Sequence, residues 1–353
     1  MIDSDRIGDG LFTLTERTRL ACMTAAAVGA GTVAVLLWWW WRTKKPAQKF
    51  QKPPSKWRKV GELSDLIVFP VKSLGPTRLT SLECTPLGLK SGWLRDRSLM
   101  VVDLTGRFLT GRQHPKMVQV LPTVNGTVLT LRAPGMMSVS IDLSKLRGKR
   151  FLTSVWDQAV PALDCGEEVA KWLSRYILQE EAGLRLVYYP LDRTCRDVRS
   201  KNKAFPRLDP EDSGAFPDAT SYCLINESSI NDLNSRLEEP VNAPRFRPNF
   251  VVKGAPAYEE DNWEWVKIGD VIFQNVMPCT RCIFTTVDPE TGTKNSKMEP
   301  LKTLRRYLLS AVSMMGAHLG LRDNRPNRIV NFGDPVYVGY VEADEEQPCK
   351  TPP

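Results

Sequence analysis

Two cysteines separated by two residues form the most reactive segment of the chain. They occur in Cys279-Thr280-Arg281-Cys282, before an apolar run at 283–287 and a turn sequence at 288–292. The pattern predicts a strand over 282–287, with Cys282 at its entry and Cys279 in the preceding turn. A positive charge on Arg281 would stabilise a neighbouring thiolate, which is the form that ligates soft metals or attacks electrophiles.

Spacing alone leaves several roles open for this pair. A half zinc site would need a second pair of cysteines at similar spacing, and the sequence contains none. A dithiol redox pair is expected where a helix follows a strand, whereas a strand and a turn are predicted here. A single thiolate ligand for a metal and two buried structural cysteines both stay open.

Three other segments place cations next to hydroxyl, acidic or amide side chains. They are Val71-Lys72-Ser73, Leu94-Arg95-Asp96-Arg97 and Phe246-Arg247-Pro248-Asn249. Arginine binds phosphate through paired hydrogen bonds, and a lysine with a serine can complete such a site. The three segments could converge on one anionic ligand, although each alone also fits ordinary surface ion pairing.

Short strands are predicted to position the first two of these segments. Apolar runs bounded by turn residues predict strands at 66–71, 80–84, 98–103, 107–111, 117–121 and 128–132. Asn125-Gly126 predicts a two-residue hairpin, because both positions of that turn require positive φ. A softer turn is predicted from Asp103 to Gly106.

Helices and further strands are predicted to position the remaining segments. An apolar stripe predicts a helix over 167–178, and a second helix is predicted over 228–237. The polar, proline-broken stretch 192–218 predicts a long loop, which in a compact domain is often functional. Strands at 250–252, 271–273 and 336–340, with turns at 268–271 and 332–336, predict a β-barrel decorated by helices, so the fold class is α+β.

Charge and cysteine usage exclude several classes of protein. The net charge is +8, but eight basic residues and no acidic ones lie between Arg42 and Lys59, so the remainder is near neutral and nucleic-acid binding is not expected. The eight cysteines are irregularly spaced in a chain too large to need disulfides, which indicates a reducing compartment. Two histidines are too few for mixed Cys and His zinc sites, for bis-His haem or for a Ser-His-Asp triad to be expected.

An uncharged segment near the N-terminus predicts a membrane anchor. Leu20 to Trp41 is long enough, at ~1.5 Å per helical residue, to cross a bilayer core of ~30 Å, and it ends in four tryptophans followed by cations. The basic flank predicts a single crossing with the C-terminal part in the cytosol. Pro46, Pro53 and Pro54 predict a stiffened tether. A cleaved targeting peptide is the alternative.

Taken together, these motifs resemble a known family. Val71-Lys72-Ser73, Leu94 to Arg97, Phe246 to Asn249, Cys279 to Pro289 and Gly333 to Tyr337 occur in the order found in MOSC proteins of the mitochondrial amidoxime reducing type. The resemblance runs from about Val60 to Val338. It implies an N-terminal tail (1–19), a transmembrane signal anchor (20–41), a basic linker (42–59), a MOSC N-terminal β-barrel-like domain (60–185), a MOSC β-barrel domain with peripheral helices (186–341) and a C-terminal tail (342–353).

The resemblance also implies a molybdenum cofactor, a pterin dithiolene phosphate, with Cys282 as the protein thiolate on the metal. It implies Asp218 as an acid close to the metal and a proton donor. The residues that match the cofactor-binding positions are Lys72, Ser73, Arg97, Thr220, Ser221, Arg247, Asn249 and Arg281. The family carries Thr-Ser after the acid, whereas this chain reads Ala219-Thr220-Ser221, which leaves the hydroxyl that contacts the phosphate open.

The activity implied by the resemblance is reduction of N-hydroxylated compounds, such as amidoximes, N-hydroxyguanidines and hydroxamic acids, on the cytosolic face of the mitochondrial outer membrane. Electrons would come from a cytochrome b5 and its NADH-dependent reductase, because no nicotinamide or flavin fingerprint is present. A non-catalytic, membrane-tethered carrier of molybdenum cofactor or sulfur is the alternative. The segment 308–330 departs from the family pattern, so substrate-pocket shape is less determined than cofactor binding.

Overall fold

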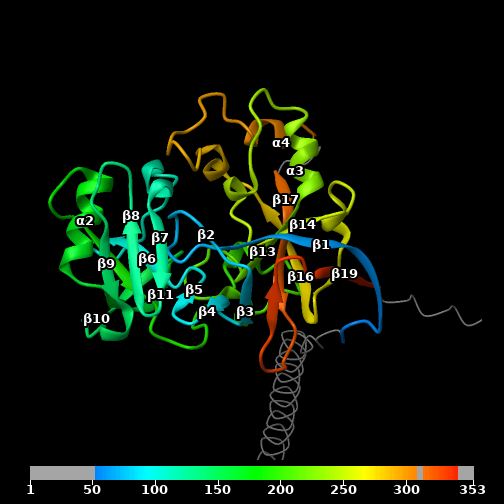
Figure 1. Ribbon diagram of the computed structural model, residues 1–353, viewed down its shortest axis with the longest axis horizontal. Helices are drawn as coiled ribbons and strands as arrows, with labels where there is room; N and C mark the ends of the chain where they lie inside the picture. Colours follow the sequence, from blue (N-terminus) through cyan, green and yellow to red (C-terminus); the bar gives the residue numbers. More distant parts are fainter. Residues whose placement is uncertain (1–51, 308–312, 341–353) are drawn as a thin grey trace, which may run out of the picture. The chain divides into compact units, whose positions relative to one another are not determined.

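A computed structural model describes residues 52–307 and 313–340 of the 353-residue chain (Figure 1). The predicted anchor at 20–41, the tail at 1–19, most of the basic linker and the C-terminal tail at 342–353 lie outside these ranges. Within them, none of the helices combines the length and the apolar character that a membrane span requires.

A closed barrel of seven strands forms the core of the second half, in the order β14-β13-β17-β16-β15-β19-β1, with β1 returning to β14. Its strands are β1 (Lys56–Val68), β13 (Tyr222–Asn226), β14 (Phe250–Lys253), β15 (Trp265–Ile268), β16 (Val271–Thr280), β17 (Met314–Leu321) and β19 (Pro335–Tyr340). Alternate residues of each strand point inward, so Tyr222, Phe250 and Phe273 meet with ring centroids 5.2–5.8 Å apart. The predicted β-barrel is therefore confirmed.

Strand β1 begins earlier than the sequence predicts. Lys56 to Glu62 pairs with β19, and Glu62 to Leu66 pairs with β14. Residues 56–59, which were expected in the linker, thus belong to the barrel. Its pairing partner β19 lies roughly 280 residues away in the sequence. Local composition alone could therefore not reveal this strand.

Two smaller sheets and a helix make up most of the first half (Figure 1). One sheet has the order β10-β11-β12-β6, from β6 (Leu99–Asp103), β10 (Arg150–Val155), β11 (Gln158–Asp164) and β12 (Leu184–Tyr188). The other is β7 (Leu121–Asn125), β8 (Val128–Arg132) and β9 (Val139–Asp142), and its hairpin at Asn125-Gly126 confirms the predicted turn. Helix α2 (Glu167–Leu178) buries Val169, Trp172, Leu173 and Ile177 of the predicted stripe.

A fourth sheet links distant parts of the chain. It has the order β18-β3-β4-β5, from β3 (Ser81–Thr85), β4 (Gly88–Ser91), β5 (Leu94–Arg95) and β18 (Ile329–Asn331). A short strand, β2 (Thr77–Arg78), pairs with β1, which itself lies in the barrel. The predicted division at 185/186 also falls within β12, so the two halves share strands across it.

Several local elements differ from the sequence prediction. The strand expected at 282–287 is a 3-10 helix, η7 (Ile283–Thr286), because the hydroxyls of Thr285 and Thr286 donate to the carbonyls of Cys282 and Ile283 at 2.9 and 2.7 Å. The strand expected at 117–121 is mostly the 3-10 helix η1 (Pro115–Gln119). The strand expected at 107–111 contributes only isolated bridges, from Arg107 to Ser154 and from Phe108 to Val102.

The remaining elements lie mostly in the second half. Helix α3 (Glu227–Asn234) is shorter than predicted, and α4 (Leu301–Tyr307) was not predicted. The loop predicted at 192–218 contains only 3-10 turns, η3 (Ser200–Asn202) and η4 (Pro210–Ser213). The other 3-10 turns are η2 (Leu143–Lys145), η5 (Ala243–Phe246) and η6 (Glu259–Asn262).

Candidate functional site

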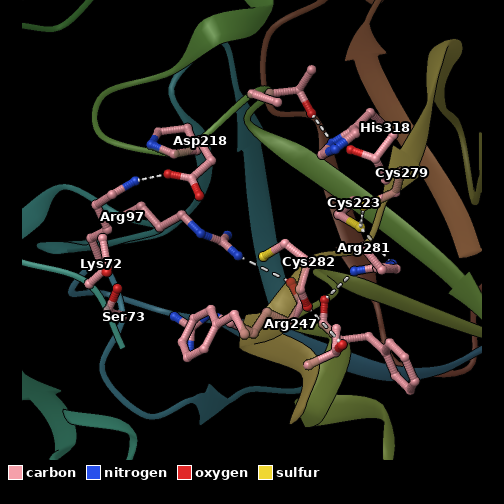
Figure 2. Close-up of a pocket in the computed structure, with 18 of the residues that line it drawn as sticks. Lys72, Ser73, Arg97, Asp218, Cys223, Arg247, Cys279, Arg281, Cys282 and His318 are labelled. Atoms are coloured by element: carbon pink, nitrogen blue, oxygen red, sulfur yellow. Dashed lines mark hydrogen bonds and ion pairs between the residues drawn. The ribbon is translucent and has the colours of Figure 1, made fainter. Parts of the chain in front are cut away.

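One cavity collects most of the residues that the sequence singled out (Figure 2). In this view Lys72, Ser73, Arg97 and Asp218 lie on one side, and the sulfur of Cys282 lies near the centre. The predicted site residues that line the cavity are Lys72, Ser73, Arg97, Asp218, Thr220, Arg247, Asn249, Arg281 and Cys282. Ser221 is the exception, because its hydroxyl donates to the carbonyl of Pro86 at 2.8 Å and faces a different depression.

Cys282 lies at the exposed side of the cavity, just after β16 ends. Cys282 is the N-cap residue of η7 and is exposed, so its thiol is accessible to a ligand. The guanidinium of Arg112 approaches the sulfur at 3.8 Å. Cys282 therefore combines an accessible sulfur with a neighbouring cation at the cavity wall.

Lys72 and Asp218 form an ion pair on the opposite side. The ammonium of Lys72 also donates to the carbonyl of Phe216 at 2.8 Å, and its burial lowers the pKa of Lys72 to about 8 despite the neighbouring carboxylate. Burial by itself would raise the pKa of Asp218, but the charge and hydrogen bond of Lys72 outweigh it and hold that pKa well below its usual range. Asp218 is thus ionised at neutral pH.

Two arginines stack on one aromatic ring beside this pair. The guanidinium carbons of Arg97 and Arg247 lie 5.0 and 4.0 Å from the ring centroid of Phe69. Arg97 pairs with Asp96 and donates to the carbonyl of Arg247 at 3.1 Å. Both arginines have positive φ, 46° and 55°, a strained conformation that is often found at functional sites.

Arg247 is incompletely satisfied by the protein. Its Nη1 donates to the carbonyl of Leu74 at 2.7 Å, whereas its Nη2 is buried without a hydrogen-bond partner among residues 52–307 and 313–340. Burial lowers the pKa of Arg247 to about 9. A buried cationic donor without a partner is costly, so its presence at a cavity wall indicates that an anionic ligand completes it. The donor set around it suits a phosphate.

Two predicted ligand residues, Asn249 and Arg281, are instead occupied by structural hydrogen bonds. The amide of Asn249 donates to the carbonyl of Ile67 and accepts from the backbone of Cys223, at 3.1 and 3.2 Å. The guanidinium of Arg281 donates to the carbonyls of Met315 and Phe246. These two side chains line the cavity, as the sequence predicted, but their hydrogen bonds go to the backbone of neighbouring segments. The sequence motifs therefore predicted their location and did not reveal these backbone partners.

Several lining residues were not singled out by the sequence. Trp156 donates to Asp218 at 3.0 Å, and the guanidinium carbons of Arg112 and Arg199 lie 5.1 and 3.9 Å from the centroid of its ring. Exposed Lys201 lines the same side. The long loop at 192–218 supplies Arg199 and Lys201, which supports the functional reading of that loop.

Cys223, Cys279 and His318 also line the cavity, from three strands far apart in sequence. The thiol of Cys223 donates to the sulfur of Cys279 at 3.8 Å, which lowers the pKa of Cys279 to about 7 and raises that of Cys223. Burial lowers the pKa of His318. Cys279 is thus a buried strand residue, and its predicted position in an outer turn is wrong because β16 extends to Thr280.

Comparison with known proteins identifies the family. Residues 60–180 match the MOSC N-terminal beta barrel domain, and residues 211–337 match the MOSC domain. The Mitochondrial amidoxime-reducing component 1 of Danio rerio is 35% identical over 92% of this chain and 96% of its own. The chain belongs to the MOSC family, among the mitochondrial amidoxime-reducing components. The relative named component 1 in Xenopus laevis is 38% identical over 91% of this chain and 92% of its own, and that of Homo sapiens is 34% identical over 93% and 96%.

Membership in the MOSC family agrees with the geometry of the cavity. The region that matches the MOSC N-terminal domain contains two of the cation segments, and the region that matches the MOSC domain contains the third and the cysteine segment. The fold brings residues from all four segments to one cavity. The names of the relatives state amidoxime reduction and a mitochondrial location for those proteins.

Proposed function

We propose that this protein is a molybdenum-cofactor-dependent reductase that converts N-hydroxylated compounds to the corresponding amine or amidine and water. The observation that carries the proposal is the convergence of the exposed Cys282 thiol with an unpaired, buried cationic donor on Arg247 in one cavity. A metal–pterin ligand needs both a thiolate for the metal and cations for its phosphate.

The chain's own residues would bind and orient such a cofactor. Arg247, through its unpaired Nη2, would bind the phosphate, and Lys72, Ser73 and Arg97 line the same side of the cavity. Cys282 would ligate the metal. When bound, the cofactor supplies the two-electron chemistry that removes the N-hydroxyl oxygen. Thr220 lines the cavity and Ser221 does not, which supports Thr220 as the hydroxyl that would contact the ligand.

The charge state of Asp218 changes the role expected for it. A carboxyl whose pKa lies well below its usual range carries no proton to donate near neutral pH. Asp218 instead accepts hydrogen bonds from Lys72 and Trp156 and lies 3.6 Å from Arg112. We therefore assign Asp218 the positioning of these groups, and Lys72, with a pKa of about 8, is the better proton donor.

Electrons for the reaction are proposed to come from a cytochrome b5 and its NADH-dependent reductase. The cationic rim formed by Arg112, Arg199 and Lys201 beside Cys282 supports docking of an acidic electron carrier. The names of the relatives and the basic flank of the segment 20–41 support an anchor in the mitochondrial outer membrane with the catalytic part in the cytosol.

The test uses the full-length chain purified in detergent, because truncation at residue 60 would remove part of strand β1. Molybdenum and pterin contents are measured, and benzamidoxime reduction is followed with cytochrome b5, its reductase and NADH. We expect one molybdenum per chain and turnover that is lost in Cys282→Ser but kept in Cys195→Ser, whose exposed thiol lies outside the cavity. Cofactor loading without turnover would instead favour a cofactor carrier. Absence of molybdenum would refute the reductase and the cofactor carrier, and would leave only the sulfur carrier.

A further inference from the structure

A second cluster of soft ligands lies in the cavity, apart from Cys282. It combines two cysteines with one histidine, so the scarcity of histidines, which argued against a mixed Cys and His site in the sequence, does not exclude it. The Sγ atoms of Cys223 and Cys279 and a ring nitrogen of His318 all lie within 4.8 Å of one another. Both thiols are buried and free. In Figure 2 this trio lies on the side of the cavity opposite to Lys72 and Asp218. Neither the phosphate-binding role nor the thiolate role of Cys282 uses it.

The barrel register explains why these three side chains meet. Tyr222, Leu224, Ala317 and Leu319 point into the barrel core, so the intervening Cys223 and His318 point to the outer face. These two residues are directly paired across β13 and β17. On the other side of β17, the register of β16 shifts between Asn275 and Met277 and again between Pro278 and Thr280, so Cys279 lies at a bulge, and bulges redirect side chains. Three neighbouring strands thus deliver one ligand each.

The hydrogen bonds of His318 leave it ready to ligate. Thr220 has a single hydroxyl proton, which it donates to the carbonyl of Tyr222 at 2.8 Å. Its contact of 2.7 Å with Nδ1 of His318 must therefore be accepted by the hydroxyl oxygen, which places the ring proton on Nδ1. Nε2 keeps its lone pair. Histidine ligands of metals characteristically donate their other ring N–H to such a partner.

The sulfur spacing fits a shared metal ion better than a disulfide. A tetrahedral ion with metal–sulfur bonds of ~2.3 Å holds its two sulfurs about 3.8 Å apart, and the Sγ atoms of Cys223 and Cys279 are 3.8 Å apart. A disulfide requires about 2.05 Å and adjacent backbones, whereas strand β17 separates these two cysteines. The guanidinium of Arg281 donates to the sulfur of Cys223 at 3.9 Å and so places a positive charge beside the sulfur pair.

We propose that Cys223, Cys279 and His318 bind a borderline-soft d10 cation, with zinc as the probe, in a three-ligand site whose fourth position opens to the cavity. Three protein ligands with one open position are typical of reactive rather than purely structural zinc sites. The ion would therefore be able to polarise an oxygen or nitrogen of a small molecule held between it and Cys282.

The test is zinc binding by the full-length chain under reducing conditions, in competition with a chromophoric chelator. We expect one zinc per chain, and cobalt substitution should give thiolate-to-cobalt charge-transfer absorption. Cys223→Ser, Cys279→Ser and His318→Gln should each weaken binding by more than ~100-fold, and Thr220→Val by about 10- to 100-fold, the range for outer-sphere partners. Cys195→Ser and Cys282→Ser serve as matched cysteine controls that should bind zinc as the wild type does.

Alkylation of the wild-type protein supplies a readout that does not depend on the folding of a variant. Zinc should protect Cys223 and Cys279 and leave Cys282 reactive. Failure to bind one zinc, binding that survives Cys223→Ser, or loss of binding in Cys282→Ser would overturn the proposal. None of these readouts involves molybdenum, so the zinc site and the proposed reductase activity can fail separately.

Discussion

Replacing Arg247 by methionine should separate ligand binding from fold stability. The buried Nη2 of Arg247 has no hydrogen-bond partner in the part of the chain that the structure describes, and burial lowers the pKa of the guanidinium to about 9. Loss of a charge-assisted contact to phosphate costs ~1.5–3 kcal/mol, or roughly 10- to 150-fold in cofactor retention. Replacing buried ion pairs by apolar residues of similar volume is neutral or stabilising by ~1–4 kcal/mol, and we take this range as the upper limit for replacing the buried guanidinium of Arg247.

One effect of the same substitution opposes this gain. The carbonyl of Leu74 loses its donor, which costs about 1 kcal/mol, so the net change in the free energy of unfolding of cofactor-free protein should lie between roughly a 1 kcal/mol loss and a 3 kcal/mol gain. Methionine also carries a Cβ, so the strain at a φ of 55° is unchanged.

The assay compares Arg247→Met with Arg95→Met, because Arg95 is partly exposed and does not line the cavity. Molybdenum and pterin contents are measured after gel filtration, and urea unfolding is measured on protein from molybdate-depleted cells. We expect Arg247→Met to lose cofactor while keeping or gaining stability, and Arg95→Met to keep both. Loss of stability in Arg247→Met with cofactor content unchanged would show that the arginine is structural.

Three further outcomes are expected. Cys282→Ser should lose molybdenum and benzamidoxime reduction while unfolding cooperatively, whereas Cys279→Ser should keep most of its molybdenum; metal analysis with the opposite pattern would reassign the ligand. The pKa of Lys72 in the folded protein, about 8, lies below its ordinary value of ~10.4. Between these two pH values the unfolded chain binds more protons than the folded chain, so the stability of cofactor-free protein should rise with pH, by at most ~1.4 kcal/mol per pH unit. Urea titrations across this range should show a smaller rise for Lys72→Met, and an equal rise would contradict the lowered pKa. Cofactor retention should fall over the same range in the wild type, because the phosphate loses the charge of Lys72. Protease added to intact mitochondria should digest the C-terminal part, and protection would refute the cytosolic orientation.

Local sequence patterns were sufficient for elements whose signals lie within a few residues. The stripe of helix α2 and the hairpin at Asn125-Gly126 are of this kind, because helical periodicity and positive φ are short-range properties. The sequence also predicted Cys282 and the cation segments as candidate site residues, because their residue types and spacing can be recognised without the fold. The two family matches agree with that reading.

Contacts between distant strands decided what the sequence left open. Strand β1 could be recognised only through its pairing with β19, and Cys279 was misplaced because β16 gains its last residues by pairing with β17. The meeting of Cys223 with His318 depends on barrel register, which a shift of one residue would reverse. The ionised state of Asp218 arises likewise from Lys72, 146 positions away. Sequence therefore determined which reactive groups the protein has, and tertiary structure determined which of them act together, because burial and charge pairing exist only after the strands close.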